Sequence, residues 1–479
     1  MAAAPVRRMD SRTISLIGLG IGIVSAIVVV LAAPMDGDPL VFLRIADAIA
    51  SGAIPYLEFP LEYPPLALLP LVLPRILVGV DAASMAYQAA FGTLSVAVTV
   101  ATGAIVAWLA RRGWSAQSVR DSLIVFLAIA LALSANVIWR FDILPAFLTI
   151  AAVAAVAAGQ PGWAGFALGL GVATKLYPAF LAPVLIAYYL FGRRWPAAAI
   201  FGFALLTTVG AVFLQAYLVA GSDALSFLNY QRDRGVEIES VVGGLALLAE
   251  SIGGVNARVS FGFGSFEVES PVVDALAAPA FIAQAIMAVG LFVAGGLAFL
   301  SDARRHGSVR PGTLIAYVVA TLLFVMLTNK VLSPQYMCWL LPFGALLPAR
   351  QALLLVVISV LTTVVYPLAF DALRASDPLI VALLNVRNLL LLVLFVWIIM
   401  PRRDRRPRQS VAMFDTPPTR PALTPNTRSP IASRRRRWAI TVIKRAANAT
   451  VTTLATVRPG MPSPSARNTT TGFASADMP

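Results

Sequence analysis

Residues 13–33 read TISLIGLGIGIVSAIVVVLAA, an unbroken run of apolar and small residues that contains no charge. About 20 such residues in a helix are needed to cross the hydrocarbon core of a bilayer. Arg7, Arg8 and Arg12 precede the run, so the positive-inside rule places residues 1–12 in the cytoplasm. The run lacks a convincing small-residue cleavage site, and we expect it to be retained as a membrane span rather than removed as a signal peptide.

The rest of the chain repeats this pattern. Of its 479 residues, 59% are hydrophobic and 13% are charged, whereas soluble domains carry roughly 25% charged residues. Further apolar segments lie at 63–80, 83–110, 121–138, 142–159, 162–174, 177–191, 196–220, 272–300, 311–328, 334–349, 351–370 and 378–400. Their lengths predict an all-α polytopic membrane protein whose bundle has about 12 transmembrane helices.

The charged loops predict the orientation of this bundle. Basic residues fill every second short loop from residue 111 onward, at Arg111–Arg112, Arg193–Arg194, Arg304–Arg305–Arg310, Arg350 and Arg402. We therefore expect those loops and both termini in the cytoplasm, with the long loops 34–62 and 221–271 outside. The proline-rich segment 63–80 would break this alternation if it crossed fully, so we expect it to enter the membrane without crossing. Residues 39–51 predict an interfacial amphipathic helix.

The net charge of +14 belongs mostly to the tail. Residues 401–479 hold 15 Lys and Arg against 3 Asp and Glu, in a background of Pro, Ser and Thr. This composition predicts a disordered cytoplasmic tail that binds anionic lipid headgroups rather than nucleic acid. The membrane domain, residues 13–400, is close to neutral, which makes its two lysines, Lys175 and Lys330, conspicuous.

Residues that could carry chemistry gather in the loops assigned to the outer side. Arg140, Lys175, Lys330 and either Arg232 or Arg234 are the expected cations of a phosphate-binding pocket. A carboxylate beside them could accept the proton of a sugar hydroxyl. Tyrosines in the same loops would offer apolar faces with a hydrogen-bonding tip, at Tyr56, Tyr63, Tyr177 and Tyr336. This combination favours sugar transfer from a lipid-linked phosphate, and no glycine-rich loop of a nucleotide-sugar enzyme is evident.

Six motifs occur in an order that resembles glycosyltransferase family 87, a family of the GT-C superfamily of polytopic enzymes. The motifs are an outer-loop aspartate, PYLEFPLEYPPL (55–66), RFDILPAFL (140–148), GLGVATKLYPAFLAP (169–183), RDRGVEIES (232–240) and NKVLSPQYMCWLLP (329–342). The resemblance covers residues 13 to 400. It implies a bacterial plasma-membrane enzyme that transfers a hexose, expected to be mannose, from a polyprenyl phosphate with inversion. The acceptor would be a hydroxyl of a glycolipid or polysaccharide on the outer face.

The resemblance also implies roles for individual residues. Asp38 best matches the family's catalytic aspartate, and Asp36 is the alternative. Lys175, Arg140 and Lys330 would hold the donor phosphate, and Arg234 is a further candidate for that role. The sugar and acceptor pocket would be shaped by Tyr63, Glu62, Asp142, Glu239, Gln335 and Tyr177.

Cofactors and other functions can be weighed from the same residues. The only histidine, His306, falls in a cytoplasmic loop, so histidine base catalysis on the outer face is excluded. No metal is required, because the cations can offset the phosphate charge, although the Asp36–Asp38 pair leaves a divalent ion open. The competing hypotheses are a secondary transporter or lipid-linked-sugar flippase and a membrane scaffold. Arg387, in the middle of an apolar segment, is the residue that best favours transport.

Overall fold

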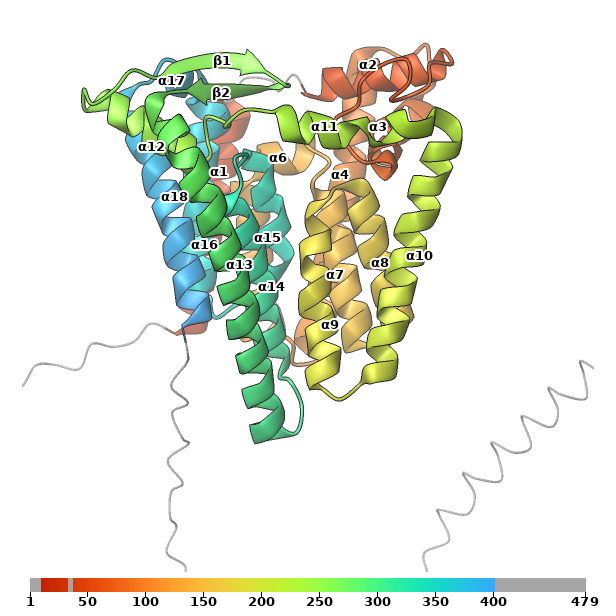
Figure 1. Cartoon of the computed structure of the whole chain (residues 1–479). Helices are drawn as coiled ribbons and strands as arrows, with labels where there is room; N and C mark the ends of the chain where they lie inside the picture. The colour runs from red at the N-terminus through yellow and green to blue at the C-terminus, as the bar shows by residue number, and fades with distance from the viewer. Residues whose placement is uncertain (1–9, 33–37, 401–479) are drawn as a thin grey trace, which may run out of the picture. The chain divides into compact units, whose positions relative to one another are not determined.

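A computed structural model describes residues 10–32 and 38–400, and these form a helical bundle capped at one end by shorter elements (Figure 1). Asp36, residues 1–9 and the basic tail 401–479, with its predicted lipid binding, lie outside the described residues. The long helices are α1 (Ser11–Ala32), α4 (Ser84–Arg111), α10 (Trp195–Ala220), α13 (Pro271–His306), α14 (Pro311–Thr328), α16 (Ala349–Thr363) and α18 (Pro378–Ile399).

Seven helical stretches in the described part of the chain are long and apolar enough to cross a membrane. Shorter apolar helices complete the bundle: α3 (Leu68–Val78), α5 (Val119–Ala132), α6 (Ser134–Trp139), α7 (Ile143–Ala157), α8 (Pro161–Thr174), α9 (Ala182–Phe191) and α15 (Met337–Gly344). The prediction of a polytopic helical membrane protein is confirmed, whereas the number of twelve spans stays a prediction. Segment 334–349 departs most from a simple span, because its helix α15 has only 8 residues, all buried.

Local sequence explains where several helices begin. Proline occupies a first-turn position of α8, α13, α14 and α18, where its missing N–H would have no partner in any case. Side-chain caps start other helices: the Ser118 hydroxyl accepts from Asp121 N, and the Asp377 carboxylate accepts from Leu379 N. These signals set helix boundaries close to those that the apolar segments predicted.

Small residues bring two of the helices into close contact. On α8, a Cβ added at Gly165 would lie 2.2 Å from Phe201 O of α10, and one added at Gly169 would lie 2.7 Å from Thr208 Cβ. The spacing of four residues places both glycines on one face, as in the small-xxx-small pattern of membrane helices. This contact fixes α8, whose C-terminal end carries Lys175, against α10.

The short elements at one end of the bundle, called the cap here, contain more secondary structure than the sequence predicted. The first long loop forms α2 (Asp38–Ala50), close to the amphipathic helix expected at 39–51, and α3 packs against it. The second long loop forms α11 (Ser226–Asp233), α12 (Val241–Ser251) and an antiparallel hairpin of β1 (Arg258–Gly262) and β2 (Ser265–Glu269). Apart from two isolated β-bridges, the hairpin is the only β-structure in the described residues. With α17 (Phe370–Arg374), these elements lie at the upper end of Figure 1.

Candidate active site

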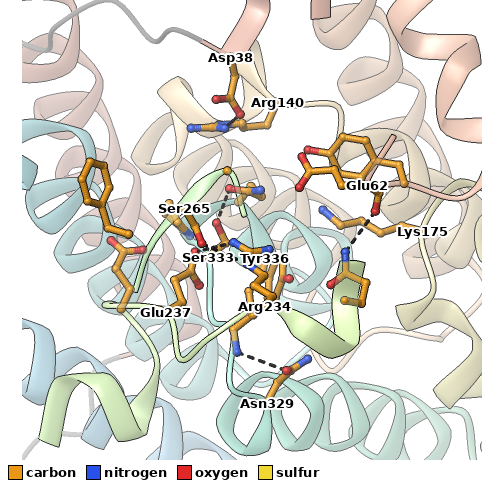
Figure 2. A pocket seen from close by; sticks show the side chains of 18 of the residues that line it. Asp38, Glu62, Arg140, Lys175, Arg234, Glu237, Ser265, Asn329, Ser333 and Tyr336 are labelled. Atoms are coloured by element: carbon orange, nitrogen blue, oxygen red, sulfur yellow. Dashed lines mark hydrogen bonds and ion pairs between the residues drawn. The ribbon is translucent and has the colours of Figure 1, made fainter. Parts of the chain in front are cut away.

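A cavity of about 830 Å³ lies beneath the cap. Its walls come from α2, the loop before α3, the segments just before α7 and α9, α11, the loop 234–240, the hairpin, the turn before α15, and α17 with the segment before it. Eleven of the residues selected from the sequence line it: Asp38, Glu62, Tyr63, Arg140, Lys175, Tyr177, Arg234, Glu239, Lys330, Gln335 and Tyr336. The structure therefore brings residues from all six motifs to one place, as Figure 2 shows for several of them.

Asp38 and Arg140 face one another at one side of the cavity (Figure 2). Asp38 is the first residue of α2, and Arg140 ends α6 in an extended conformation that turns its side chain toward the cap. The two side chains form an ion pair, and Arg140 Nη2 also donates to the hydroxyl of Tyr366 at 2.5 Å. The expected catalytic carboxylate is thus held by an expected phosphate ligand.

Lys175 and Asp142 form a buried ion pair. Lys175 Nζ lies 2.7 and 2.9 Å from the two carboxylate oxygens of Asp142, and Trp339 Nε1 donates to the same carboxylate at 2.7 Å. Asp142 does not line the cavity but lies behind Lys175, whose ammonium is surrounded by aromatic rings at 5.1 to 6.0 Å, those of Tyr63, Phe141, Tyr336 and Trp339. Asp142 therefore neutralises and orients a cavity cation, and its expected role in shaping the sugar pocket stays a prediction.

The side chains of Arg234 and Lys330 form contacts within and next to the loop between α11 and α12. Arg234 Nη2 lies 3.5 Å from Glu237 Oε1, and its Nε donates to the Ser265 hydroxyl at 3.1 Å. Lys330 Nζ donates to the carbonyl oxygens of Arg232, at 2.7 Å, and of Arg234. Partial burial lowers the pKa of the Lys330 ammonium. Within the described residues no carboxylate lies within ion-pair distance of Lys330, so its charge is the least neutralised of the four cations.

Glu239 is a buried carboxylate in the cavity wall. Its side chain is almost fully buried, and neither carboxylate oxygen has a hydrogen-bond partner among the described residues. Burial raises the pKa of Glu239 to about 8, against the opposing effect of Arg387, while Glu237 raises it further. Arg387, fully buried on α18, donates to the backbone carbonyl of Glu239 at 3.2 Å. Arg387, the charged residue in the middle of the last apolar segment, therefore supports the loop that carries Glu239.

The remaining predicted residues complete the wall. Tyr177 stacks on Trp339 with ring centroids 3.8 Å apart, and Tyr336 stacks on Trp339 at 4.0 Å. Tyr63 packs edge-on against Phe141, at 4.9 Å between ring centroids. Gln335 Oε1 accepts from the Ser333 hydroxyl at 2.8 Å. Glu62, beside Tyr63 and half-buried, also lines the cavity. These contacts place aromatic side chains beside the cations that line the cavity.

An apolar hollow of about 160 Å³ adjoins the cavity. It lies between α9, α13 and α14 and is walled mainly by alanine, glycine, leucine and phenylalanine side chains. Phe180, half exposed, lines both the cavity and this hollow. A cavity lined by charged and aromatic side chains therefore adjoins this hollow, which is called the apolar groove below.

No group of three or more His, Cys, Asp or Glu side chains that could hold a metal ion is present in the described ranges, which do not include Asp36. The expectation that no metal is required therefore stays a prediction. Reasoning from the sequence missed Glu237, Ser265, Tyr366 and Trp339. Glu237 lay inside the RDRGVEIES motif and Trp339 inside NKVLSPQYMCWLLP, so their motifs were signals, whereas Ser265 and Tyr366 lay in no motif.

Comparisons with known proteins bear on the identity of this site. No curated protein matches the sequence. Two solved structures of ArnT from Cupriavidus metallidurans, one in the apo state and one bound to undecaprenyl phosphate, are similar to this chain at 14% identity. Each alignment covers 81% of this chain and 77% of the other, with TM-scores of 0.42 and 0.41. The model of glycosyltransferase family 87 matches residues 61–334. This match spans more than half of the chain, which therefore belongs to glycosyltransferase family 87.

Proposed function

We propose that the cavity is the active site of an inverting transferase that moves a hexose, mannose in our proposal, from a polyprenyl phosphate. The acceptor is a hydroxyl of a glycolipid or polysaccharide. The observation that carries this proposal is a single cavity that brings carboxylates and cations together and adjoins an apolar groove. Membership of a glycosyltransferase family gives the reaction class, and the cavity supports the proposal of a lipid-linked phosphate donor.

The donor would place its two chemically different parts in two parts of the site. Its phosphate carries negative charge and suits the cations that line the cavity, such as Arg140 and Lys330, because guanidinium and ammonium groups bind phosphate oxygens. Its polyprenyl chain is apolar and suits the groove behind Phe180. A free nucleotide sugar has no such chain, so the groove favours a lipid-linked donor.

Asp38 is the residue that we propose as general base. It would accept the proton of the acceptor hydroxyl while the hydroxyl oxygen bonds to the anomeric carbon and the bond to the phosphate oxygen breaks. Attack from the face opposite the phosphate inverts the anomeric centre. Arg140, in ion-pair contact with Asp38, holds this carboxylate in place, and its guanidinium would offset negative charge on the departing phosphate. Asp36 stays the alternative base.

We further propose that the cavity opens away from the cytosol. The cap that covers it lies at one end of the bundle, and the turns between α9 and α10 and between α13 and α14 lie at the other (Figure 1). Those turns contain Arg193, Arg194 and Arg310, and basic residues are enriched in cytoplasmic loops. The arrangement supports an active site on the extracytoplasmic face of a bacterial plasma membrane, with both termini inside.

Transport is the alternative function, and no structural observation favours it. Arg387, which favoured it in the sequence, is engaged with the backbone of Glu239 in the described structure. Substrate counterflow in proteoliposomes without covalent sugar transfer would replace our proposal with this one.

The experiment that tests the proposal is the replacement Asp38→Asn. Membranes containing the variant would receive radiolabelled polyprenyl-phosphate mannose and a glycolipid acceptor. Loss of a general base lowers turnover by roughly 10²–10⁴-fold, and this is the loss that we expect. Asp47→Asn is the matched control, because Asp47 lies on the same helix α2, pairs with Arg75 at 2.7 Å and does not line the cavity. Full turnover by a folded Asp38→Asn variant would contradict the assignment.

A further inference from the structure

Four aromatic side chains form a continuous row along one wall of the cavity. The ring of Phe261 lies edge-on to Phe266 at 5.1 Å, Phe266 to Phe370 at 5.6 Å, and Phe370 to Tyr366 at 5.0 Å between centroids. All four residues line the cavity. None was selected from the sequence, because they come from β1, β2, α17 and the kinked segment before it.

The row connects the outside of the cap with the proposed reaction centre. At its outer end Phe261 is 68% exposed, which a core residue would not be. At its inner end the Tyr366 hydroxyl accepts a hydrogen bond from Arg140, and Arg140 is paired with Asp38. A molecule that follows the row from the surface would therefore reach the proposed base.

Charged groups accompany the rings. The Arg374 guanidinium lies over the Phe266 ring, 4.2 Å from its centroid, and pairs with Asp371 at 2.9 Å. Both side chains are exposed, at 44% and 92%. Lipid chains offer no partner for such groups. A pyranose ring does, because its axial C–H bonds form an apolar face that stacks on aromatic rings while its hydroxyls point outward toward charged and polar groups.

We propose that this aromatic row, Phe261–Phe266–Phe370–Tyr366, is the binding site for the glycan of the acceptor. The spacing of successive rings is comparable to the length of one sugar residue, so the row fits a chain of several sugars. The preferred acceptor is then an oligosaccharide, free or lipid-linked, whose growing end reaches Asp38, and a single sugar is a poorer acceptor. This inference rests on the proposed glycosyl transfer and adds the class of its acceptor.

The hairpin itself supplies a matched pair of variants. Phe261 and Phe263 lie two residues apart and are both exposed, but only Phe261 lines the cavity. Transfer from the polyprenyl-phosphate donor would be measured with a mannose oligosaccharide and with a monomannosyl acceptor. We expect Phe261→Ala to raise the KM for the oligosaccharide by about fivefold to tenfold. Its KM for the monosaccharide acceptor and for the donor should stay unchanged, and Phe263→Ala should match the wild type throughout.

Two outcomes would overturn the inference. Equal effects of Phe261→Ala and Phe263→Ala on both acceptors would mean that the hairpin rings contact lipid headgroups or support the fold. Unchanged kinetics in Phe261→Ala together with Phe370→Ala would mean that no glycan lies on the row. Failure of the proposed function would look different, because the wild type itself would then transfer no sugar. Binding of the oligosaccharide to an Asp38→Asn variant, measured by calorimetry, tests the row without any turnover.

Discussion

The ion pair between Lys175 and Asp142 allows the sharpest prediction about this protein. Replacing Asp142 by Asn keeps the shape of the side chain but removes the charge that Lys175 contacts at 2.7 and 2.9 Å. The side chains of Asp142 and Lys175 are only 1% and 12% exposed, so water can take the place of the lost partner only through the cavity. The variant is left with an ammonium group that is buried and unpaired.

The size of the effect follows from this burial. Removing one partner of a buried ion pair destabilises a protein by about 3–5 kcal/mol. We expect about 3 kcal/mol, at the lower end, because the amide oxygen of Asn can still accept from Lys175 or Trp339 and because four aromatic rings surround the ammonium. Adding Lys175→Met removes the orphan charge, so the double variant should regain stability. Its donor binding should be weaker than that of the wild type, because Lys175 is an expected ligand of the donor phosphate.

The single cysteine provides the assay. Cys338 is fully buried beside Trp339, so a thiol-reactive fluorophore labels the detergent-solubilised protein only as it unfolds. The temperature at which Cys338 becomes labelled should be clearly lower in Asp142→Asn than in the wild type, and it should recover in part in the double variant. Asp233→Asn is the control, since Asp233 and its partner Arg232 are 49% and 73% exposed, and exposed pairs contribute little. Equal labelling temperatures in Asp142→Asn and Asp233→Asn would refute the reasoning.

Three further predictions concern the cavity and its surroundings. Burial raises the pKa of the Glu239 carboxyl from its usual 4.5 to about 8, so the protonated side chain contributes stability below pH 4.5, and this contribution is lost as pH rises toward 8. The unfolding temperature of the wild type should therefore fall between pH 4.5 and 8 relative to that of Glu239→Gln. Parallel curves of unfolding temperature against pH would contradict the raised pKa. Gly264 has a φ of +67°, and an added Cβ would lie 3.0 Å from the Tyr230 hydroxyl. Gly264→Ala should therefore lower transfer more than Gly253→Ala, which has a similar φ of +76° but open space around it; equal turnover would show that the contact is unimportant. In the apolar groove, Gly296→Leu should raise the KM for a long-chain polyprenyl donor but not for a short-chain analogue. Equal changes in KM for both donors would mean that the polyprenyl chain does not bind in the groove.

Much of the cavity wall was predictable because its residues lie in short motifs. Asp38, Arg140, Lys175 and Lys330 stood out because they are charged and gather in the motifs assigned to the outer side. What could not be predicted was their pairing. Lys175 and Asp142 are separated by 33 positions and Arg140 and Tyr366 by 226, so only the packing of the helices decides that they touch.

The sequence by itself determined the helical membrane fold and the family, because hydropathy and motif order are local properties that do not depend on which helices become neighbours. Tertiary structure alone decided that Asp142 lies behind Lys175, that Arg387 supports the Glu239 loop, and that the hairpin brings aromatic rings to the cavity. The physical reason is that burial and charge pairing are set by what surrounds a side chain, and in this chain those surroundings come from segments far apart in sequence.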